Sequence, residues 1–245
     1  MRFTRRFLIR SGFLAAVCIL SSAAVSAQPW TGFDSKTRYL AMGDSLSAGY
    51  GAMPATLGFT YDLYHFGAID RVQNTLLCVM AVPGALSDDV LKYQVPQVSR
   101  FFQNTGQDYN QVITLTVGGN DLLQVLTGAD PEVVLTKFGG NLGAVLSSLL
   151  TEFPRARVFI ATMYDPKLDV PNEKMLILGL NQTIAYVAGS FPSNVVTVVD
   201  MYSAFEGRKG LLLSELPNAD PGQIHPTNQG YAVMARAFAA AIRKK

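Results

Sequence analysis

Ser45 stands where nucleophilic catalysis commonly places its serine. It follows a short apolar run at residues 39–42 and belongs to the turn Gly43-Asp44-Ser45-Leu46. Open α/β sheets bind ligands at the carboxyl ends of their strands, so Ser45 is the candidate nucleophile. The plainer interpretation is a polar turn, because Asp and Ser often hydrogen-bond their own backbone after a strand. The elbow motif Gly-x-Ser-x-Gly is excluded, since Ser47 occupies the place of its second glycine.

The candidate general base is His225, in the turn-rich segment 220–227 before the last predicted helix. Polar glycine turns also follow two other apolar runs, at Pro83-Gly84 and at Gly118-Gly119-Asn120-Asp121. The carboxyl ends of parallel strands lie at one edge of a sheet, so these turns can meet there. We therefore expect a site at this edge that combines four residues from distant parts of the chain: Ser45, Gly84, Asn120 and His225.

The other histidine, His65, lies in the irregular stretch 46–74 and has no partner motif, so we expect it on the surface or lining a pocket. This stretch carries a row of aromatic residues that either line a substrate pocket or cover the sheet: Tyr50, Phe59, Tyr61, Tyr64 and Phe66.

Apolar runs and amphipathic stretches alternate along the chain. The runs predict buried strands at residues 39–42, 75–82, 111–117, 157–162 and 195–200. Helices are predicted from Ser87, over 131–153, over 171–188 and from about 227 to 242, and Gly139-Gly140 could interrupt the second of these. Strands that need cover on both faces indicate a mostly parallel five-stranded sheet in a three-layer α/β/α sandwich.

The first 27 residues have the composition of a secretory signal. Four arginines precede the apolar run at residues 12–20, and the small-residue site Val25-Ser26-Ala27 follows. The segment 4–10 also resembles a twin-arginine export signal, and both export routes remain open. We expect a single domain over residues 28–245 and a periplasmic or secreted protein. The apolar run is too short to span a bilayer, so no stable membrane span is expected in the mature chain.

Charge and cysteine content exclude several function classes. The net charge of the whole chain is +2, and removal of the signal takes away four arginines and no acidic residue, which leaves −2. No basic cluster suited to nucleic acid remains apart from the C-terminal tail. Of the two cysteines, Cys18 leaves with the signal, so Cys78 has no internal partner and is interpreted as a small buried hydrophobe. No His pair, Cys pair or Lys-containing glycine loop indicates a metal or phosphate site, and no cofactor is expected.

Taken together, these blocks resemble the SGNH (GDSL-type) serine hydrolases over nearly the whole mature chain. The matching blocks, in the family's order, are Gly43-Asp44-Ser45-Leu46, Gly84, Gly118-Gly119-Asn120-Asp121 and His225-Pro226. The resemblance implies a flavodoxin-like fold, no metal, and ester hydrolysis through an acyl-serine. It also implies an oxyanion hole built from the Ser45 and Gly84 N–H groups and the Asn120 amide.

The sequence departs from the family pattern at the triad acid. The family places this acid three residues before the histidine, where Gly222 stands in this chain. Asp220, five residues before His225, is the nearest carboxylate and orients the imidazole if Pro221-Gly222 fold it back. Otherwise Asp220 only opens a turn, and a backbone carbonyl holds the His225 tautomer in a Ser-His dyad.

These observations predict an exported hydrolase of carboxylic esters whose substrate is a lipid or another small-molecule ester. Two alternatives stay open. The first is a carbohydrate O-acetylesterase. The second is an inactive binding protein on the same fold, motivated by the missing acid at Gly222, although the joint presence of Ser45, Asn120 and His225 argues against it.

Overall fold

A sheet of five parallel strands organises the computed structural model, which describes residues 37–65, 69, 76–102, 110–220 and 223–244. The predicted signal, residues 1–27, lies outside the described residues. The strands are β1 (Thr37–Gly43), β2 (Leu76–Val79), β3 (Asn110–Thr116), β4 (Arg157–Ala161) and β5 (Val196–Val199). Their spatial order, β2-β1-β3-β4-β5, is that of flavodoxin-like folds. The predicted α/β class is therefore confirmed.

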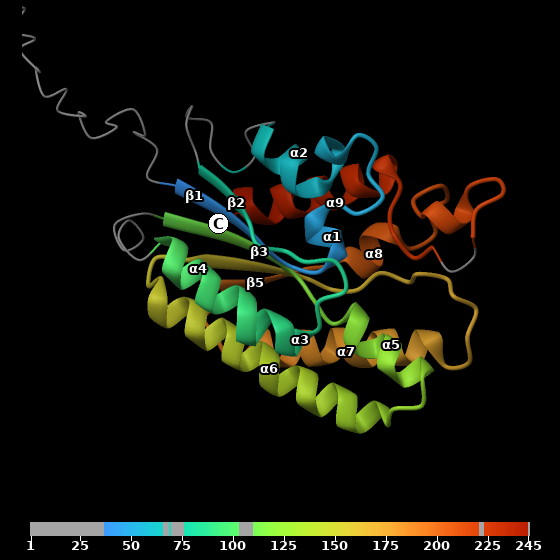
Figure 1. The fold of residues 1–245 in the computed structure, drawn as a ribbon, viewed down its shortest axis with the longest axis horizontal. Coiled ribbons are helices and arrows are strands. Elements are labelled where there is room, and N and C mark those ends of the chain that lie inside the picture. The colour runs from blue at the N-terminus through green and yellow to red at the C-terminus, as the bar shows by residue number, and fades with distance from the viewer. Residues whose placement is uncertain (1–36, 66–68, 70–75, 103–109, 221–222, 245) are drawn as a thin grey trace, which may run out of the picture. The chain divides into compact units, whose positions relative to one another are not determined.

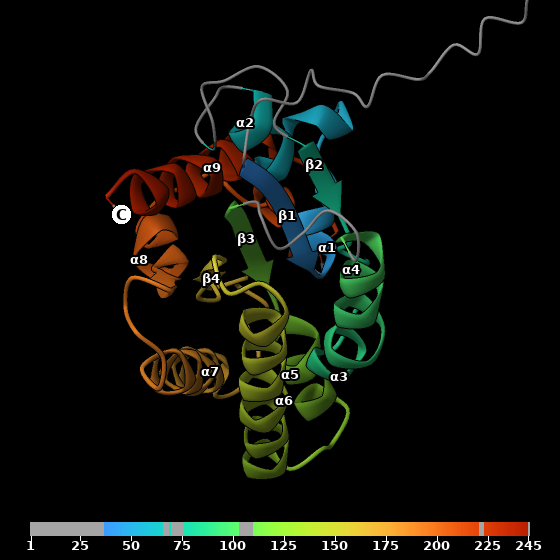
Figure 2. The same cartoon turned by 90° about the vertical axis from the view of Figure 1, so that its left-hand side faces the viewer.

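Helices cover both faces of the sheet, as Figures 1 and 2 show. One layer contains α2 (Phe59–His65), α8 (Met201–Phe205) and α9 (Asn228–Arg243). The opposite layer contains α4 (Val95–Phe102), α6 (Pro131–Glu152) and α7 (Glu173–Ala188). This is the three-layer arrangement that the alternating pattern predicted.

Strand β1 shows why the sheet needs cover on both sides. Side chains alternate across a strand, so Leu40 and Met42 enter the core with α4, α6 and α7. Tyr39 and Ala41 enter the other core, with α2, α8 and α9. All four are fully buried, which explains the uninterrupted apolar run in the sequence. The one polar atom among them, the Tyr39 hydroxyl, is 3.0 Å from Thr114 Oγ1 and so keeps a hydrogen-bond partner.

Helix α6 is the longest helix in the described part of the chain. Asp130 begins it by accepting hydrogen bonds from the N–H groups of Glu132 and Val133, with Pro131 in the first turn. The pair Gly139-Gly140 does not interrupt it. A Cβ at Gly139 would lie 3.1 Å from Thr183 Cγ2, so this glycine allows α6 and α7 to approach closely. Among the described residues, α6 alone has the length and apolarity of a membrane span, and its buried face belongs to the core beneath the sheet.

Several short elements were not predicted. They are α1 (Ser45–Ala48), η1 (Ala55–Leu57), α2, α5 (Gly119–Leu126), α8 and η3 (Leu213–Glu215). The helix predicted from Ser87 begins as α3 (Ser87–Asp89), but it then passes through a π-helical turn, η2 (Val90–Gln94), before α4. The unpredicted elements α1 and α5, together with the π-helical turn η2, lie at the carboxyl edge of the sheet.

Candidate active site

Ser45 is the first residue of α1, directly after β1. Asp44 caps this helix, because its Oδ1 accepts the Leu46 N–H at 3.0 Å. The same oxygen accepts the Thr116 hydroxyl at 2.7 Å, which ties the nucleophile turn to the end of β3. Asp44 is buried, and this burial raises the pKa of its carboxyl to about 6 in spite of the two hydrogen bonds.

Gly43 allows the chain to leave β1 in this direction. Its φ of +114° is unfavourable for a residue with a Cβ, and a Cβ here would lie 1.8 Å from the carbonyl oxygen of Thr116. Gln94, at the end of the π-helical turn, is 2 % exposed and pairs with both backbone groups of Gly43. Its Oε1 accepts the Gly43 N–H at 2.8 Å, and its Nε2 donates to the Gly43 carbonyl at 2.7 Å. Sequence reasoning missed Gln94, because no residue pattern marks a π turn.

His225 faces Ser45 across the edge of the sheet. Its Nε2 lies 2.8 Å from Ser45 Oγ, although the two residues are 180 positions apart. The backbone on either side of His225 is held by other elements. The N–H of Leu213 donates to the His225 carbonyl at 2.9 Å, and the Tyr164 hydroxyl donates to the Ile224 carbonyl at 2.7 Å.

The surroundings of His225 favour its neutral form. The ring is half-buried and lies against Tyr50, with 4.6 Å between ring centroids. Burial lowers the pKa of His225 below its ordinary value, because a charged imidazolium loses hydration there. At neutral pH the imidazole can therefore accept the Ser45 proton through Nε2.

Three candidate oxyanion donors lie at the same edge of the sheet as Ser45. Within the described part of the chain, the backbone N–H groups of Ser45 and Gly84 make no hydrogen bond. The Asn120 amide donates to the Ala85 carbonyl at 2.9 Å, which places Asn120 beside the Gly84 loop and leaves its second amide hydrogen for a ligand. Unused donors at one edge of a sheet can stabilise an oxyanion.

A buried polar cluster joins the two loops that carry these donors. Asp121 accepts the Ser87 hydroxyl at 2.6 Å and the Ser87 N–H at 3.0 Å. Asn141, on α6, donates to the Ser87 hydroxyl at 3.0 Å. Burial raises the pKa of the Asp121 carboxyl, as expected for a carboxylate inside the fold. Asp121 and Ser87 thus fix the position of Asn120 relative to Gly84.

Asp220, the predicted triad acid, precedes His225 by five residues in the turn-rich segment before α9. The His225 ring hydrogen-bonds Ser45 Oγ through Nε2. Asp220 is exposed, and its backbone carbonyl accepts the Gln223 N–H at 3.0 Å. This hydrogen bond closes a turn, as expected if Asp220 only opens a turn before His225. Pro221 and Gly222 lie outside the described residues. The orienting role of Asp220 therefore stays a prediction.

The aromatic row contributes one residue to the site. Tyr50 lies against His225, whereas Phe59 is buried and stacks on Phe238 in the core. His65 is exposed at the end of α2, where its ring lies near Tyr61 and Tyr64. Phe66 is outside the described residues. Phe59 therefore covers the sheet, whereas the role of the other rings as a pocket wall stays a prediction.

Comparison with known proteins agrees with this arrangement. The profile of the family described as GDSL-like Lipase/Acylhydrolase matches residues 39–238. A search among curated proteins gave no match. The chain belongs to the GDSL-like lipase/acylhydrolase family, as the motif blocks predicted, and it is a carboxylic-ester hydrolase.

Solved structures share the fold at low sequence identity. A member of the lipolytic G-D-S-L family from Veillonella parvula superposes with a TM-score of 0.63 at 19% identity, over 85% of this chain and 100% of that one. An extracellular lipase from Streptomyces rimosus gives 0.59 at 20%, over 84% and 99%. An acetyl xylan esterase from Geobacillus stearothermophilus gives 0.62 at 16%, over 85% and 95%. These likenesses establish the fold.

Proposed function

We propose that this protein is an exported serine hydrolase that cleaves small-molecule or lipid esters through an acyl-Ser45 intermediate, with His225 as general base. The supporting observation is the 2.8 Å contact between Ser45 Oγ and His225 Nε2, at the sheet edge where the turns of Gly84 and Asn120 also lie. This distance lies within the hydrogen-bond range that an activated serine requires.

The reaction follows from these positions. His225 Nε2 takes the Ser45 proton as Oγ attacks the ester carbonyl carbon, and the carbonyl oxygen becomes an oxyanion. The N–H groups of Ser45 and Gly84 and the Asn120 amide stabilise this charge. His225 then gives the proton to the leaving alcohol, and the C–O bond to the alcohol breaks. Water, deprotonated by the same imidazole, releases the acid from Ser45.

The direct test is the substitution Ser45→Ala. Turnover of a short-chain aryl ester should fall by several powers of ten while the protein stays folded, because removal of one member of such a catalytic unit abolishes most of its effect. Ser148→Ala, at an exposed position of α6, is the matched control and should retain activity. A fluorophosphonate probe should label Ser45, as peptide mass spectrometry would show. Normal turnover by Ser45→Ala would remove this residue from the mechanism.

Export is a separate part of the proposal and is supported by the composition of residues 1–27. Fractionation of a bacterial host that expresses the full chain should find the protein outside the cytoplasm with Gln28 as its first residue. Replacing Arg5 and Arg6 by lysine tests the route. Blocked export would indicate the twin-arginine pathway, and unchanged export would indicate the general secretory pathway. Retention of the uncleaved chain in the cytoplasm would contradict export.

A further inference from the structure

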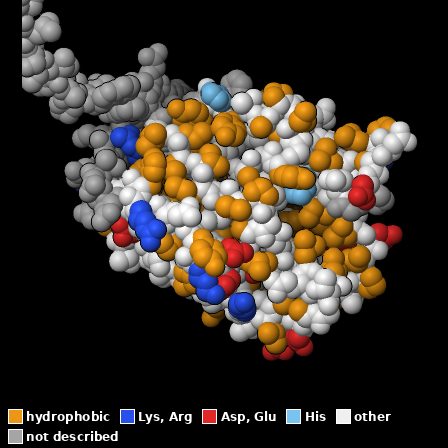
Figure 3. Space-filling model, in the orientation of Figure 1, with side chains coloured by type: hydrophobic (Ala, Val, Ile, Leu, Met, Phe, Trp, Pro, Cys, Tyr) orange, Lys and Arg blue, Asp and Glu red, His pale blue; other side chains and the backbone are white. Residues whose placement is uncertain are grey.

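An apolar pocket lies beside the proposed catalytic residues. Its walls include Gly119 and Ile224, the immediate neighbours of Asn120 and His225, so the pocket borders both loops of the site. The pocket opens to solvent, and the space along its walls, open solvent included, is about 430 Å³. In the space-filling view, hydrophobic side chains gather over α5 and the segment before α9, whereas Lys and Arg lie toward α4 and α6 (Figure 3).

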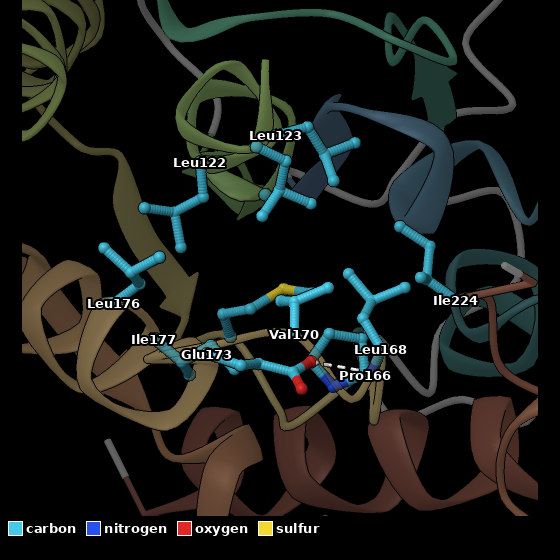
Figure 4. A pocket seen from close by; sticks show the side chains of 12 residues that line it. Leu122, Leu123, Pro166, Leu168, Val170, Glu173, Leu176, Ile177 and Ile224 are labelled. Atoms are coloured by element: carbon cyan, nitrogen blue, oxygen red, sulfur yellow. Dashed lines mark hydrogen bonds between the residues drawn. The ribbon is translucent and has the colours of Figure 1, made fainter. Parts of the chain in front are cut away.

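The walls of this pocket come from four segments. Figure 4 shows Leu122 and Leu123 of α5 on one side, with Leu168 and Val170 of the β4–α7 connection opposite. Leu176 of α7 and Ile224 lie at opposite ends of the view. Side chains of this kind bind hydrocarbon, because burial removes apolar surface from water on both partners.

Glu173 is the one charged residue in the lining, and its charge is directed at backbone groups. Its carboxylate accepts the N–H of Leu168 at 2.8 Å and that of Asp169 at 3.0 Å. Through these two hydrogen bonds, the Glu173 carboxylate holds the β4–α7 connection, one wall of the pocket, in place. The pocket surface therefore remains suited to a hydrocarbon chain.

We propose that this pocket holds the acyl chain of the ester, so that the enzyme prefers acyl groups of several carbons to acetyl. The inference rests on the proposed function and specifies its substrate class. The acyl group stays on Ser45 after the alcohol has left, so it benefits from a walled apolar site. The alcohol must instead reach water with a proton from His225, and Tyr50, which contacts that ring, is 51 % exposed.

The wall opposite α5 is held in an unusual backbone conformation. Lys167, Asp169 and Asn172 have φ values of 57°, 56° and 61°, which are unfavourable for residues with a Cβ. Polar contacts hold this connection in place: Asn181 bonds both backbone groups of Met163, at 2.7 and 2.8 Å, and Lys167 pairs with Glu215. Together with Glu173, these contacts preform the pocket before substrate arrives. Glu173 is thus a positioning residue for acyl selectivity.

The first experiment measures kcat/KM of the purified protein for p-nitrophenyl esters from acetyl to dodecanoyl. We expect a rise with each added methylene, by up to about fourfold, until the pocket is filled. Leu123→Trp should fill the pocket and lower the octanoyl-to-acetyl ratio at least tenfold. Leu123→Ala should enlarge it and move the optimum to longer chains. Leu178→Trp, on α7 outside the pocket, is the control and should keep the original ratio.

A second series tests the positioning role of Glu173. Glu173→Ala should raise KM for the octanoyl ester more than it lowers kcat, because the wall loosens while the reacting groups stay in place. Glu173→Gln still offers an acceptor oxygen and should restore part of the loss. Glu132→Gln, on the exposed first turn of α6, is the control. If Glu173→Ala lowers kcat alone, the positioning role is wrong.

Binding without turnover provides an independent readout. Octanoate should raise the melting temperature of Ser45→Ala, and this shift should disappear when Leu123→Trp is added. Circular dichroism checks the fold of each variant, and Val170→Trp, from the opposite wall, replaces any variant that does not fold.

The failures of the two proposals can be told apart. Preference for acetyl, or an octanoyl-to-acetyl ratio that Leu123→Trp and Val170→Trp leave unchanged, overturns the pocket assignment even if Ser45 is labelled and esters are cleaved. Selectivity that follows the alcohol chain in a series of alkyl acetates overturns it as well. Absence of both ester cleavage and Ser45 labelling overturns the proposed function itself.

Discussion

The side-chain amide of Gln94 pairs with both the N–H and the carbonyl of Gly43, two residues before Ser45. At Gly43, where β1 ends, the Gln94 side chain thus makes the hydrogen bonds that a neighbouring strand would otherwise make. The Gly43 carbonyl also accepts the Val82 N–H at 3.0 Å, at the start of the loop that carries Gly84. One buried amide therefore helps to hold the nucleophile turn next to the oxyanion loop.

Gln94→Leu should lower turnover by roughly ten- to a hundredfold, because small displacements of reacting groups are costly to catalysis. It should also lower the free energy of unfolding by about 1–3 kcal/mol, because the buried Gly43 N–H loses its acceptor while the Gly43 carbonyl keeps the Val82 N–H. Steady-state kinetics and urea denaturation measure the two effects. Full activity in a destabilised variant would show that Gln94 has a structural role alone.

The activity of Gln94→Glu should depend on pH in a way that the activity of the original protein does not. An ionised carboxylate accepts the Gly43 N–H but cannot donate to the Gly43 carbonyl, whereas the protonated form can do both. Burial raises the pKa of such a carboxyl, so the activity ratio of variant to original should increase as pH falls through that raised pKa. Gln97→Glu, on the exposed side of α4, is the control. A ratio that does not change with pH would contradict the pairing.

The acidic limb of the kcat/KM profile should lie below pH 6.5, the ordinary pKa of histidine, because burial lowers the pKa of His225. Activity is lost as pH falls through this value, since imidazolium cannot accept the Ser45 proton. Tyr50→Ala should admit water to the ring and move the limb upward. A limb above 6.5 in the original protein would contradict a burial-dominated His225.

Asn120→Ala should reduce kcat by roughly a hundred- to a thousandfold with little change in KM, because an oxyanion donor acts mainly in the transition state. Asn194→Ala, at an exposed position before β5, is the control. An increase in KM with normal kcat would assign Asn120 to substrate binding instead.

Asp220→Asn should lower turnover by less than about tenfold if a backbone carbonyl holds the His225 tautomer, because changes of an exposed side chain such as Asp220 usually perturb little. A carboxylate that held the tautomer would make the loss as large as about ten-thousandfold, as in the serine-protease example. The pH profile adds a second reading, since loss of a nearby negative charge would lower the pKa of His225. A large loss with a shifted limb would restore Asp220 as the triad acid.

Stability should depend on Asp44 in a defined pH window. Burial raises the pKa of its carboxyl from 3.8 to about 6, so between these values the folded chain holds a proton that the unfolded chain has released. The free energy of unfolding should therefore decrease as pH rises through this window. Asp44→Asn should remove that part of the slope, as denaturation at a series of pH values would show. Parallel stability curves for the two proteins would contradict the assignment.

The residues of the candidate site could be located from the sequence because their signals are local. Ser45 and Asn120 follow apolar runs directly, and His225 stands just before a helix, so a parallel sheet was enough to bring them to one edge. Gln94 could not be found this way. Gln94 lies in a segment whose sequence pattern indicates only a helix. The π turn that directs its amide at Gly43 depends on tertiary contacts.

The walls of the apolar pocket also could not be predicted from sequence patterns. They combine α5, the connection before α7 and the residue before His225, and each of these segments looks unremarkable alone. Lys167, Asp169 and Asn172 adopt positive φ values although none of them is glycine, the residue that usually signals this conformation in a sequence. Polar contacts from other elements hold them in it. Tertiary structure here overrides local preference.

The π-helical turn makes the number of residues before α4 as important as their identity. In this turn the Val95 N–H bonds the Val90 carbonyl, one residue farther back than in an α-helix. Deleting the exposed Lys92 would allow an ordinary α-helical turn to close, and the side chains before the deletion would rotate by about 100° relative to α4. The loop that carries Gly84 would then join the helix in a different direction. Insertions and deletions should therefore be tolerated far less between Ser87 and Val95 than the exposed side chains of this segment suggest.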